Sequence, residues 1–136
     1  MLCLFRYLQK FQKYKEIKLD INGNEINALV ADSLIKRILG LMYRNDNTNM
    51  FFIFNKDSKY GIWMLNMKFP LDIVWLDKNM KVIDFIEGIK PCTSLFSCKT
   101  YTPKYSSRYV LELKKGFIKK FKINKNIKIK SILYVY

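Results

Sequence analysis

The first third of the chain changes from a strand-like to a helical pattern of apolar residues. Between residues 16 and 31, apolar and polar side chains alternate on both sides of an Asn22-Gly23 turn. This pattern predicts an antiparallel hairpin, because successive side chains of a strand point to opposite faces. Residues 33–44 then carry apolar side chains three and four positions apart, which predicts a helix. Asp32 or Ser33 is suited to cap its start.

Several later runs are apolar at nearly every position. Residues 50–54, 60–65 and 71–77 have this pattern, which is typical of strands that are buried on both faces. In the last run Leu71, Ile73 and Trp75 share one face, and Asp72 lies on the other. The remaining predicted elements are strands at 81–87, 107–113 and 126–136 and a short helix at 116–121.

These elements predict one mainly β (α+β) domain, either a compact β-sandwich or a partly open barrel with two or three short helices. A length of 136 residues suits one domain, and a hydrophobic fraction of 50% is enough for its core. We assign residues 15–136 to this domain and residues 1–14 to an N-terminal extension that can form a short helix. The narrow apolar face of that helix favours docking on the domain over anchoring at a membrane surface.

The chain contains no histidine, and this absence excludes several kinds of chemistry. Histidine is the usual general base near neutral pH and the commonest metal ligand, so Ser-His-Asp and Cys-His nucleophiles are excluded. Cys3, Cys92 and Cys98 are too few for a typical zinc site. We therefore expect no metal centre and no cofactor, and any catalysis would use Asp, Glu, Lys, Tyr or Cys alone.

Neither end of the chain predicts a membrane span or a signal peptide. The N-terminal apolar run covers only residues 2–5, whereas a signal peptide needs about 7–15 such residues and a membrane helix about 18. We expect a cytoplasmic protein without a transmembrane segment. The long loop at 88–106 contains Cys92 and Cys98, whose spacing is compatible with a disulfide or with two structural thiols.

Blocks in a fixed order carry a family resemblance. Residues 37–42 read Arg-Ile-Leu-Gly-Leu-Met, residues 63–72 run from Trp-Met through Asn66 to Pro-Leu-Asp, and residues 109–112 read Tyr-Val-Leu-Glu. Over about residues 28–130 this order resembles the uncharacterised bacterial and archaeal domain-of-unknown-function family 192. The resemblance implies a compact β-rich fold and no established activity. The chain departs from the family at residues 65–67, which read Leu-Asn-Met where relatives often have Lys-Asn-Thr.

Asp72 is an acid inside a run predicted to be buried, and a buried carboxylate needs a partner. One interpretation is a structural pair with an arginine that stabilises the fold. The other is a pocket with a tryptophan wall, although Trp63 and Trp75 are more often core residues. An unbroken strand would also point Trp63 and Asn66 to opposite sides. The candidate ligand-binding residues, with the 88–106 loop as a lid, are Arg37, Trp63, Asn66, Asp72 and Arg108.

More than half of the net charge of +14 lies after Glu112, where no acid follows. Lysines without interleaved arginines are more often a solvated face than a recognition surface, but they can also bind polyanions in a salt-dependent way. The candidate polyanion-binding residues are Lys114, Lys115, Lys119, Lys120, Lys122, Lys125, Lys128 and Lys130.

Together these features favour a non-catalytic binding or accessory module for a small polar molecule or a carbohydrate. The first alternative is electrostatic binding of nucleic acid or another anionic surface through the C-terminal lysines. The second is an enzyme that uses Asp72 with a lysine or a cysteine. The alternatives differ in what they require: salt-sensitive binding for the first, and a solvent-accessible Asp72 for the second.

Overall fold

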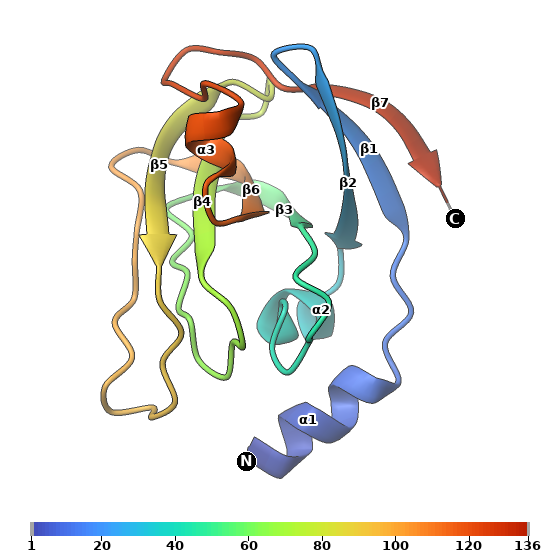
Figure 1. Cartoon of the computed structure of the whole chain (residues 1–136), viewed down its shortest axis with the longest axis vertical. Coiled ribbons are helices and arrows are strands. Elements are labelled where there is room, and N and C mark those ends of the chain that lie inside the picture. Colours follow the sequence, from blue (N-terminus) through green and yellow to red (C-terminus); the bar gives the residue numbers. More distant parts are fainter. Residues whose placement is uncertain (1, 136) are drawn as a thin grey trace.

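One curved β-sheet with three short helices forms the protein (Figure 1). The structure is a computed structural model that describes residues 2–135. Within this range the helices are α1 (Leu2–Lys10), α2 (Leu34–Leu39) and α3 (Phe117–Lys120). The strands are β1 (Glu16–Ile21), β2 (Asn24–Ala31), β3 (Met50–Ser58), β4 (Leu71–Leu76), β5 (Val82–Ile89), β6 (Ser107–Lys114) and β7 (Lys130–Val135).

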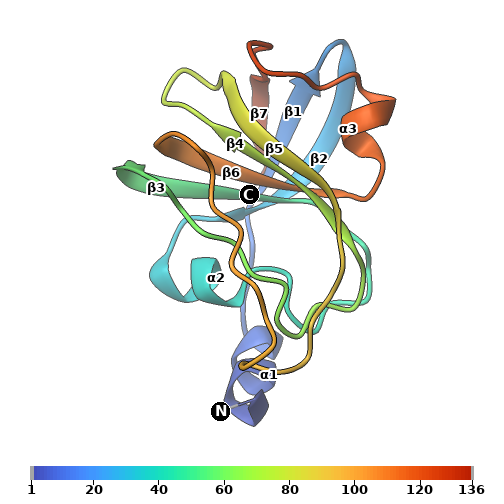
Figure 2. The same cartoon turned by 90° about the vertical axis from the view of Figure 1, so that its left-hand side faces the viewer.

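The strands pair in the order β5-β4-β6-β3-β2-β1-β7, and the sheet curls into a half-barrel (Figure 2). All neighbouring pairs are antiparallel except β2 and β3, which are parallel and are connected through α2. Parallel strands need such a crossover connection, because a tight turn reverses the chain direction and can join only antiparallel strands. The predicted mainly β class is confirmed, and of the two predicted forms the protein has the partly open barrel.

The N-terminal hairpin follows the predicted pattern. Glu16 to Ile21 of β1 pair with Leu29 to Asn24 of β2. Asn22 and Gly23 between them have φ values of 52° and 86°, as a two-residue hairpin turn requires. The Asn22 side chain also donates a hydrogen bond of 2.8 Å to the carbonyl oxygen of Phe121. The turn is therefore tied to the chain segment that follows α3.

The core lies on both faces of the sheet, and β4 contributes to both. All six residues of β4 are buried. Leu71, Ile73 and Trp75 pack in the cluster on one face, while Val74 and Leu76 pack in the cluster on the other, as the alternation predicts. Trp75 is fully buried, and its indole N–H donates a hydrogen bond of 2.8 Å to the Tyr60 carbonyl oxygen.

The predicted strand at 60–65 is not a sheet strand. Ile62 and Leu65 form only isolated bridges, with Tyr101 and Cys92 respectively. The chain turns immediately afterwards at Asn66, whose φ is 59°. The run is apolar because Ile62 and Met64 pack in the same core cluster as Trp75 of the sheet. A buried loop and a buried strand give the same hydrophobic pattern.

The N-terminal helix α1 contacts the domain through a polar side chain. The Gln9 amide nitrogen donates hydrogen bonds to the carbonyl oxygens of Gly40 (3.0 Å) and Met42 (2.8 Å). Leu4, Tyr7 and Phe11 remain exposed. Among the described residues, no helix has the length and apolar character that a membrane crossing requires.

Candidate functional site

One pocket lies between α2, the loop at 61–67 and the sheet, and has a volume of about 250 Å³. Both views place α1, α2 and the tip of the 88–106 loop toward one end of the molecule and α3 toward the other (Figures 1 and 2). Most of the residues that line it have apolar side chains. Its chemically distinctive members are Arg37, Trp63 and Glu112.

Arg37 is held at the pocket by the end of α2. Ser33 caps the helix, with its side chain accepting a hydrogen bond from the backbone N–H of Lys36, and the helix stops at Gly40, whose φ is 49°. The Arg37 side chain donates a hydrogen bond from Nη1 to the Ile53 carbonyl oxygen (3.0 Å). Its guanidinium lies 5.3 Å from the centroid of the Phe54 ring. These contacts fix the cation at the pocket wall.

Trp63 lies at the pocket and is 36% exposed, unlike the fully buried Trp75. The prediction of a core position therefore holds for Trp75 and not for Trp63. The reason is that Trp63 belongs to a loop that covers the sheet, so its ring is covered on fewer sides than a residue of a central strand. An aromatic ring in this position offers an apolar surface on which a ligand can stack.

Asn66 is next to the pocket but is not part of its lining. Its neighbours Leu65 and Met67 do line it. The backbone of Asn66 accepts a hydrogen bond from the N–H of Tyr43 and donates one to the carbonyl oxygen of Cys92, each 3.0 Å long. Its amide nitrogen Nδ2 is buried without a hydrogen-bond partner among the described residues.

Glu112 is the pocket residue that the sequence did not single out. It is 5% exposed, and its register neighbours on β3 and β4 are the apolar Met50 and Ile73. Burial raises the pKa of its carboxyl to about 8. The oxygen Oε2 is buried and has no hydrogen-bond partner within the described part of the chain. The available signal was its place in the Tyr-Val-Leu-Glu block of the family pattern.

Asp72 lies away from this pocket and has three hydrogen-bond donors of its own. Its carboxylate accepts hydrogen bonds from the backbone N–H groups of Gly88 (2.8 Å), Gly116 (2.9 Å) and Ile118 (3.0 Å). Two of these donors belong to the start of α3, so the carboxylate joins β4 to β5 and to that helix. Backbone donors occupy the place that an arginine partner was expected to fill.

Arg108 and the C-terminal lysines are also separate from the pocket. Arg108 donates a hydrogen bond of 2.9 Å from Nε to Asp57, and both side chains are partly exposed. Apart from the half-buried Lys114, the predicted lysines are exposed. They extend from the end of β6 through α3 to the start of β7, and α3 lies toward the end of the molecule opposite α2 (Figure 1). Of the five predicted ligand-binding residues, the structure brings Arg37 and Trp63 together in one pocket.

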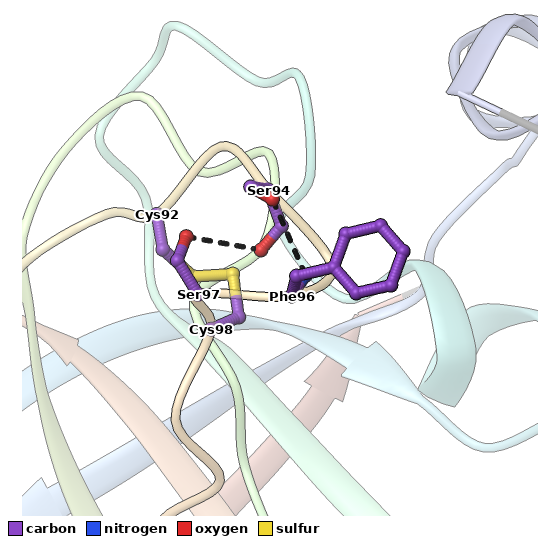
Figure 3. Close-up of a disulfide and its surroundings, with 5 residues drawn as sticks. All are labelled: Cys92, Ser94, Phe96, Ser97 and Cys98. Carbon is purple, nitrogen blue, oxygen red and sulfur yellow. Dashed lines mark hydrogen bonds between the residues drawn. A yellow bond between two sulfur atoms is a disulfide. The ribbon is translucent and has the colours of Figure 1, made fainter.

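The long loop at 88–106 is crosslinked by a disulfide between Cys92 and Cys98 (Figure 3). Ser94 accepts hydrogen bonds from the backbone N–H of Phe96 (3.2 Å) and from the hydroxyl of Ser97 (3.3 Å) inside this small ring. No residue of the loop lines the pocket, so the loop is not the predicted lid. It supports the pocket instead, because Cys92 pairs with Leu65.

Among the described residues, no group of three or more Cys, Asp and Glu side chains is placed to hold a metal ion. The pocket itself offers one carboxyl and one guanidinium. This donor set can bind polar groups of a ligand through hydrogen bonds and charge.

Known proteins with similar sequences include members of an uncharacterised family. The model of domain-of-unknown-function family 192, described as "Uncharacterized ACR", matches residues 17–131. A UPF0127 protein of Pyrococcus horikoshii is 32% identical over 106 residues, which cover 74% of this chain and 84% of that protein. A UPF0127 protein of Thermococcus gammatolerans is 34% identical over 93 residues, or 66% of this chain and 56% of that protein.

Two solved structures share the fold. A protein of Sinorhizobium meliloti, described as a "putative transcription regulator", superposes with a TM-score of 0.76 at 22% identity, over 88% of this chain and 94% of that one. A protein of unknown function from Novosphingobium aromaticivorans gives a TM-score of 0.71 at 21% identity, over 85% and 83%. At these identities the likeness extends to the fold alone.

Proposed function

The chain belongs to domain-of-unknown-function family 192, and from that premise we propose that it is a non-catalytic binding or accessory module for a small polar molecule. The site is the pocket lined by Arg37, Trp63 and Glu112. The family match confirms the resemblance that the sequence motifs predicted. The description of the family names no ligand and no reaction. The proposal therefore depends on the geometry of the pocket.

The observation that carries the proposal is the buried oxygen of Glu112 that has no partner in the described structure. More than about 90% of buried polar groups in proteins form hydrogen bonds, because an unpaired one costs on the order of 1–3 kcal/mol. Because Glu112 lines the pocket, a ligand that binds there is a source of the missing partner. In the complex, a hydrogen bond from the ligand would then offset the free-energy cost of the unpaired oxygen.

The pocket also suits a ligand in size and character. Its volume of about 250 Å³ is just below the roughly 300–1,000 Å³ of most small-molecule sites, so the ligand is small. Apolar walls with a few polar groups are the usual composition of such sites. A carbohydrate could stack on Trp63, because sugar rings have an apolar face that fits an aromatic side chain.

A thermal-shift screen of sugars, nucleotides, amino acids and organic acids tests the proposal. A compound at 100 times its Kd stabilises the folded protein by about 2.7 kcal/mol. The shift should disappear in Glu112→Leu and Arg37→Met and persist in Arg108→Gln, whose side chain pairs with Asp57 away from the pocket. A shift that persists in both pocket variants would place the site elsewhere and overturn the proposal.

Polyanion binding is a second candidate that one observation supports. None of the eight C-terminal lysines forms an ion pair with another described residue, and seven of them are exposed. Binding of an oligonucleotide or an anionic vesicle through about five phosphates would weaken steeply with salt, with a logarithmic slope of about −4. Lys119→Gln combined with Lys122→Gln should reduce that slope by about 2. A slope that the double variant leaves unchanged would refute this candidate.

The cytoplasmic location remains a prediction, and the disulfide is an observation against it. Stable structural disulfides are rare in reducing cytosol and common in oxidising compartments. Rapid alkylation of thiols in intact cells, followed by mass analysis of residues 92–98, decides the question. Alkylated Cys92 and Cys98 would support the cytoplasm, and an intact bridge would refute it.

A further inference from the structure

The pocket contains two groups of opposite formal charge that are not paired with each other. Among the residues that the structure describes, Arg37 and Glu112 are the only charged ones that line it. No ion pair within 4.0 Å joins them among the ion pairs of residues 4–132. Arg37 uses Nη1 to bind the Ile53 carbonyl oxygen. A guanidinium has five N–H donors, so others remain for a ligand.

Few charged groups lie close to the carboxyl of Glu112. Its neighbours on the adjacent strands, Met50 and Ile73, are apolar. On its own strand Lys114 shares the same face, but its Nζ lies 5.9 Å from the centroid of the Phe117 ring. The loop at 61–67 contributes no charged side chain to the pocket, and α2 contributes only Arg37. A positive group that reaches Glu112 from the pocket would therefore be its first close partner.

We propose that the ligand is a small zwitterion, a free amino acid with an apolar side chain, whose ammonium group pairs with Glu112 and whose carboxylate pairs with Arg37. This inference rests on the binding function proposed above. A purely cationic ligand would leave Arg37 unpaired, and a purely anionic one would leave Glu112 without a positively charged partner. The zwitterion satisfies both groups with charge-assisted hydrogen bonds, which are about twice as strong as neutral ones.

The remaining features of the pocket agree with a ligand of this shape. Most of the other lining residues have apolar side chains, among them Leu65 and Met67, so an aliphatic side chain would lose contact with water there. The glycines at 40 and 61 place no side chain in the lining. A volume of about 250 Å³ holds one molecule of this size and excludes long peptides.

Pairing with an ammonium group couples binding to proton release. Burial raises the pKa of Glu112 to about 8 in the empty pocket, so the carboxyl is mostly protonated at pH 7. The ammonium group favours the carboxylate, and binding at pH 7 then releases about 0.9 proton per ligand to solvent. The apparent affinity should rise about ninefold between pH 6 and pH 7 and level off above pH 8.

The probes are the proteinogenic amino acids, two leucine analogues and a set of neutral monosaccharides and polyols. The analogues are 4-methylpentanoate, which lacks the ammonium group, and 3-methylbutylamine, which lacks the carboxylate. A thermal-shift screen of the full chain selects the tightest ligand. Calorimetry of that ligand at pH 7, in two buffers with different ionisation enthalpies, counts the protons released.

We expect an amino acid to bind, the single-charge analogues to bind at least about tenfold more weakly, and about 0.9 proton to be released. Proton release should vanish in Glu112→Gln and remain in the control Glu25→Gln, which changes an exposed carboxylate. Glu112→Met fills the same space without a polar group and serves if the amide variant does not fold.

Other outcomes separate this inference from the binding function. Binding of a neutral sugar or polyol without proton release, lost in Glu112→Leu, would overturn the zwitterion and leave the pocket as a binding site. Amino-acid binding that survives both Glu112→Gln and Arg37→Met would overturn the assignment to this pocket. A panel without any ligand would overturn both.

Discussion

Replacement of Glu112 by glutamine should change how the stability of the protein depends on pH. An unfolded chain ionises this carboxyl near its ordinary pKa of 4.5, whereas burial in the folded protein raises the pKa to about 8. Between these values the folded state binds more protons than the unfolded state. The free energy of unfolding of the wild type therefore falls as the pH rises through this range.

The size of the effect follows from the difference between the two pKa values. One pKa unit corresponds to about 1.4 kcal/mol, so a rise from 4.5 to about 8 amounts to about 4–5 kcal/mol over the full range. This loss of stability is absent below about pH 4 and complete above about pH 9. Glutamine keeps the shape and cannot ionise. Its buried amide costs on the order of 1–3 kcal/mol at every pH.

Urea unfolding between pH 5 and pH 9, followed by tryptophan fluorescence, measures the difference directly because Trp75 is buried in the core. Glu112→Gln should be less stable than the wild type at pH 5 and more stable at pH 8, so the two curves cross. The exposed control Glu25→Gln should run parallel to the wild type. Parallel curves for Glu112→Gln would refute the inference that an ionisable, unpaired carboxyl is buried at this position.

Three further outcomes are expected from other parts of the structure. Asp72→Ala should lower the free energy of unfolding in urea by about 3–5 kcal/mol, because three backbone N–H groups lose their acceptor; a loss below 1 kcal/mol would contradict this role. Reduction of the Cys92–Cys98 bridge should lower stability in thermal unfolding by about 2 kcal/mol, since the loop it closes spans only six residue steps, and unchanged melting would argue against the bridge in solution. Gly40→Ala should cost about 1–2 kcal/mol because φ is 49° and an added Cβ would lie 3.4 Å from the Phe52 ring; full stability would show that the backbone there relaxes.

The pocket could be predicted only in part, and the residues show why. Arg37 and Trp63 were candidates because rare residue types stand in blocks that resemble a family, and both line the pocket. Asp72 stands in one of the same blocks but bonds to the start of α3. The sequence does not reveal which backbone N–H groups lie above a strand. That depends on how the segment after β6 turns back over the sheet.

Glu112 is the opposite case, because it lines the pocket although the sequence did not predict it as a site residue. A single acid in a strand of apolar residues usually points to solvent, and the local pattern alone assigns it no special role. It is buried because β6 is an interior strand of the sheet, between β3 and β4. Strand order is a long-range property, so neither the burial of this carboxyl nor its raised pKa follows from neighbouring residues in the chain.

The sequence by itself determined the elements whose signals are local. The hairpin at 16–31, the alternation of β4 between two core faces and the start of α2 follow from turn residues, periodicity and capping, which act over a few positions. Only the tertiary structure decided that residues 60–65 are a covering loop, that Trp63 is exposed while Trp75 is buried, and that Glu112 and Arg37 line one pocket. These features arise when segments distant in sequence pack together, and burial depends on the neighbours that packing supplies.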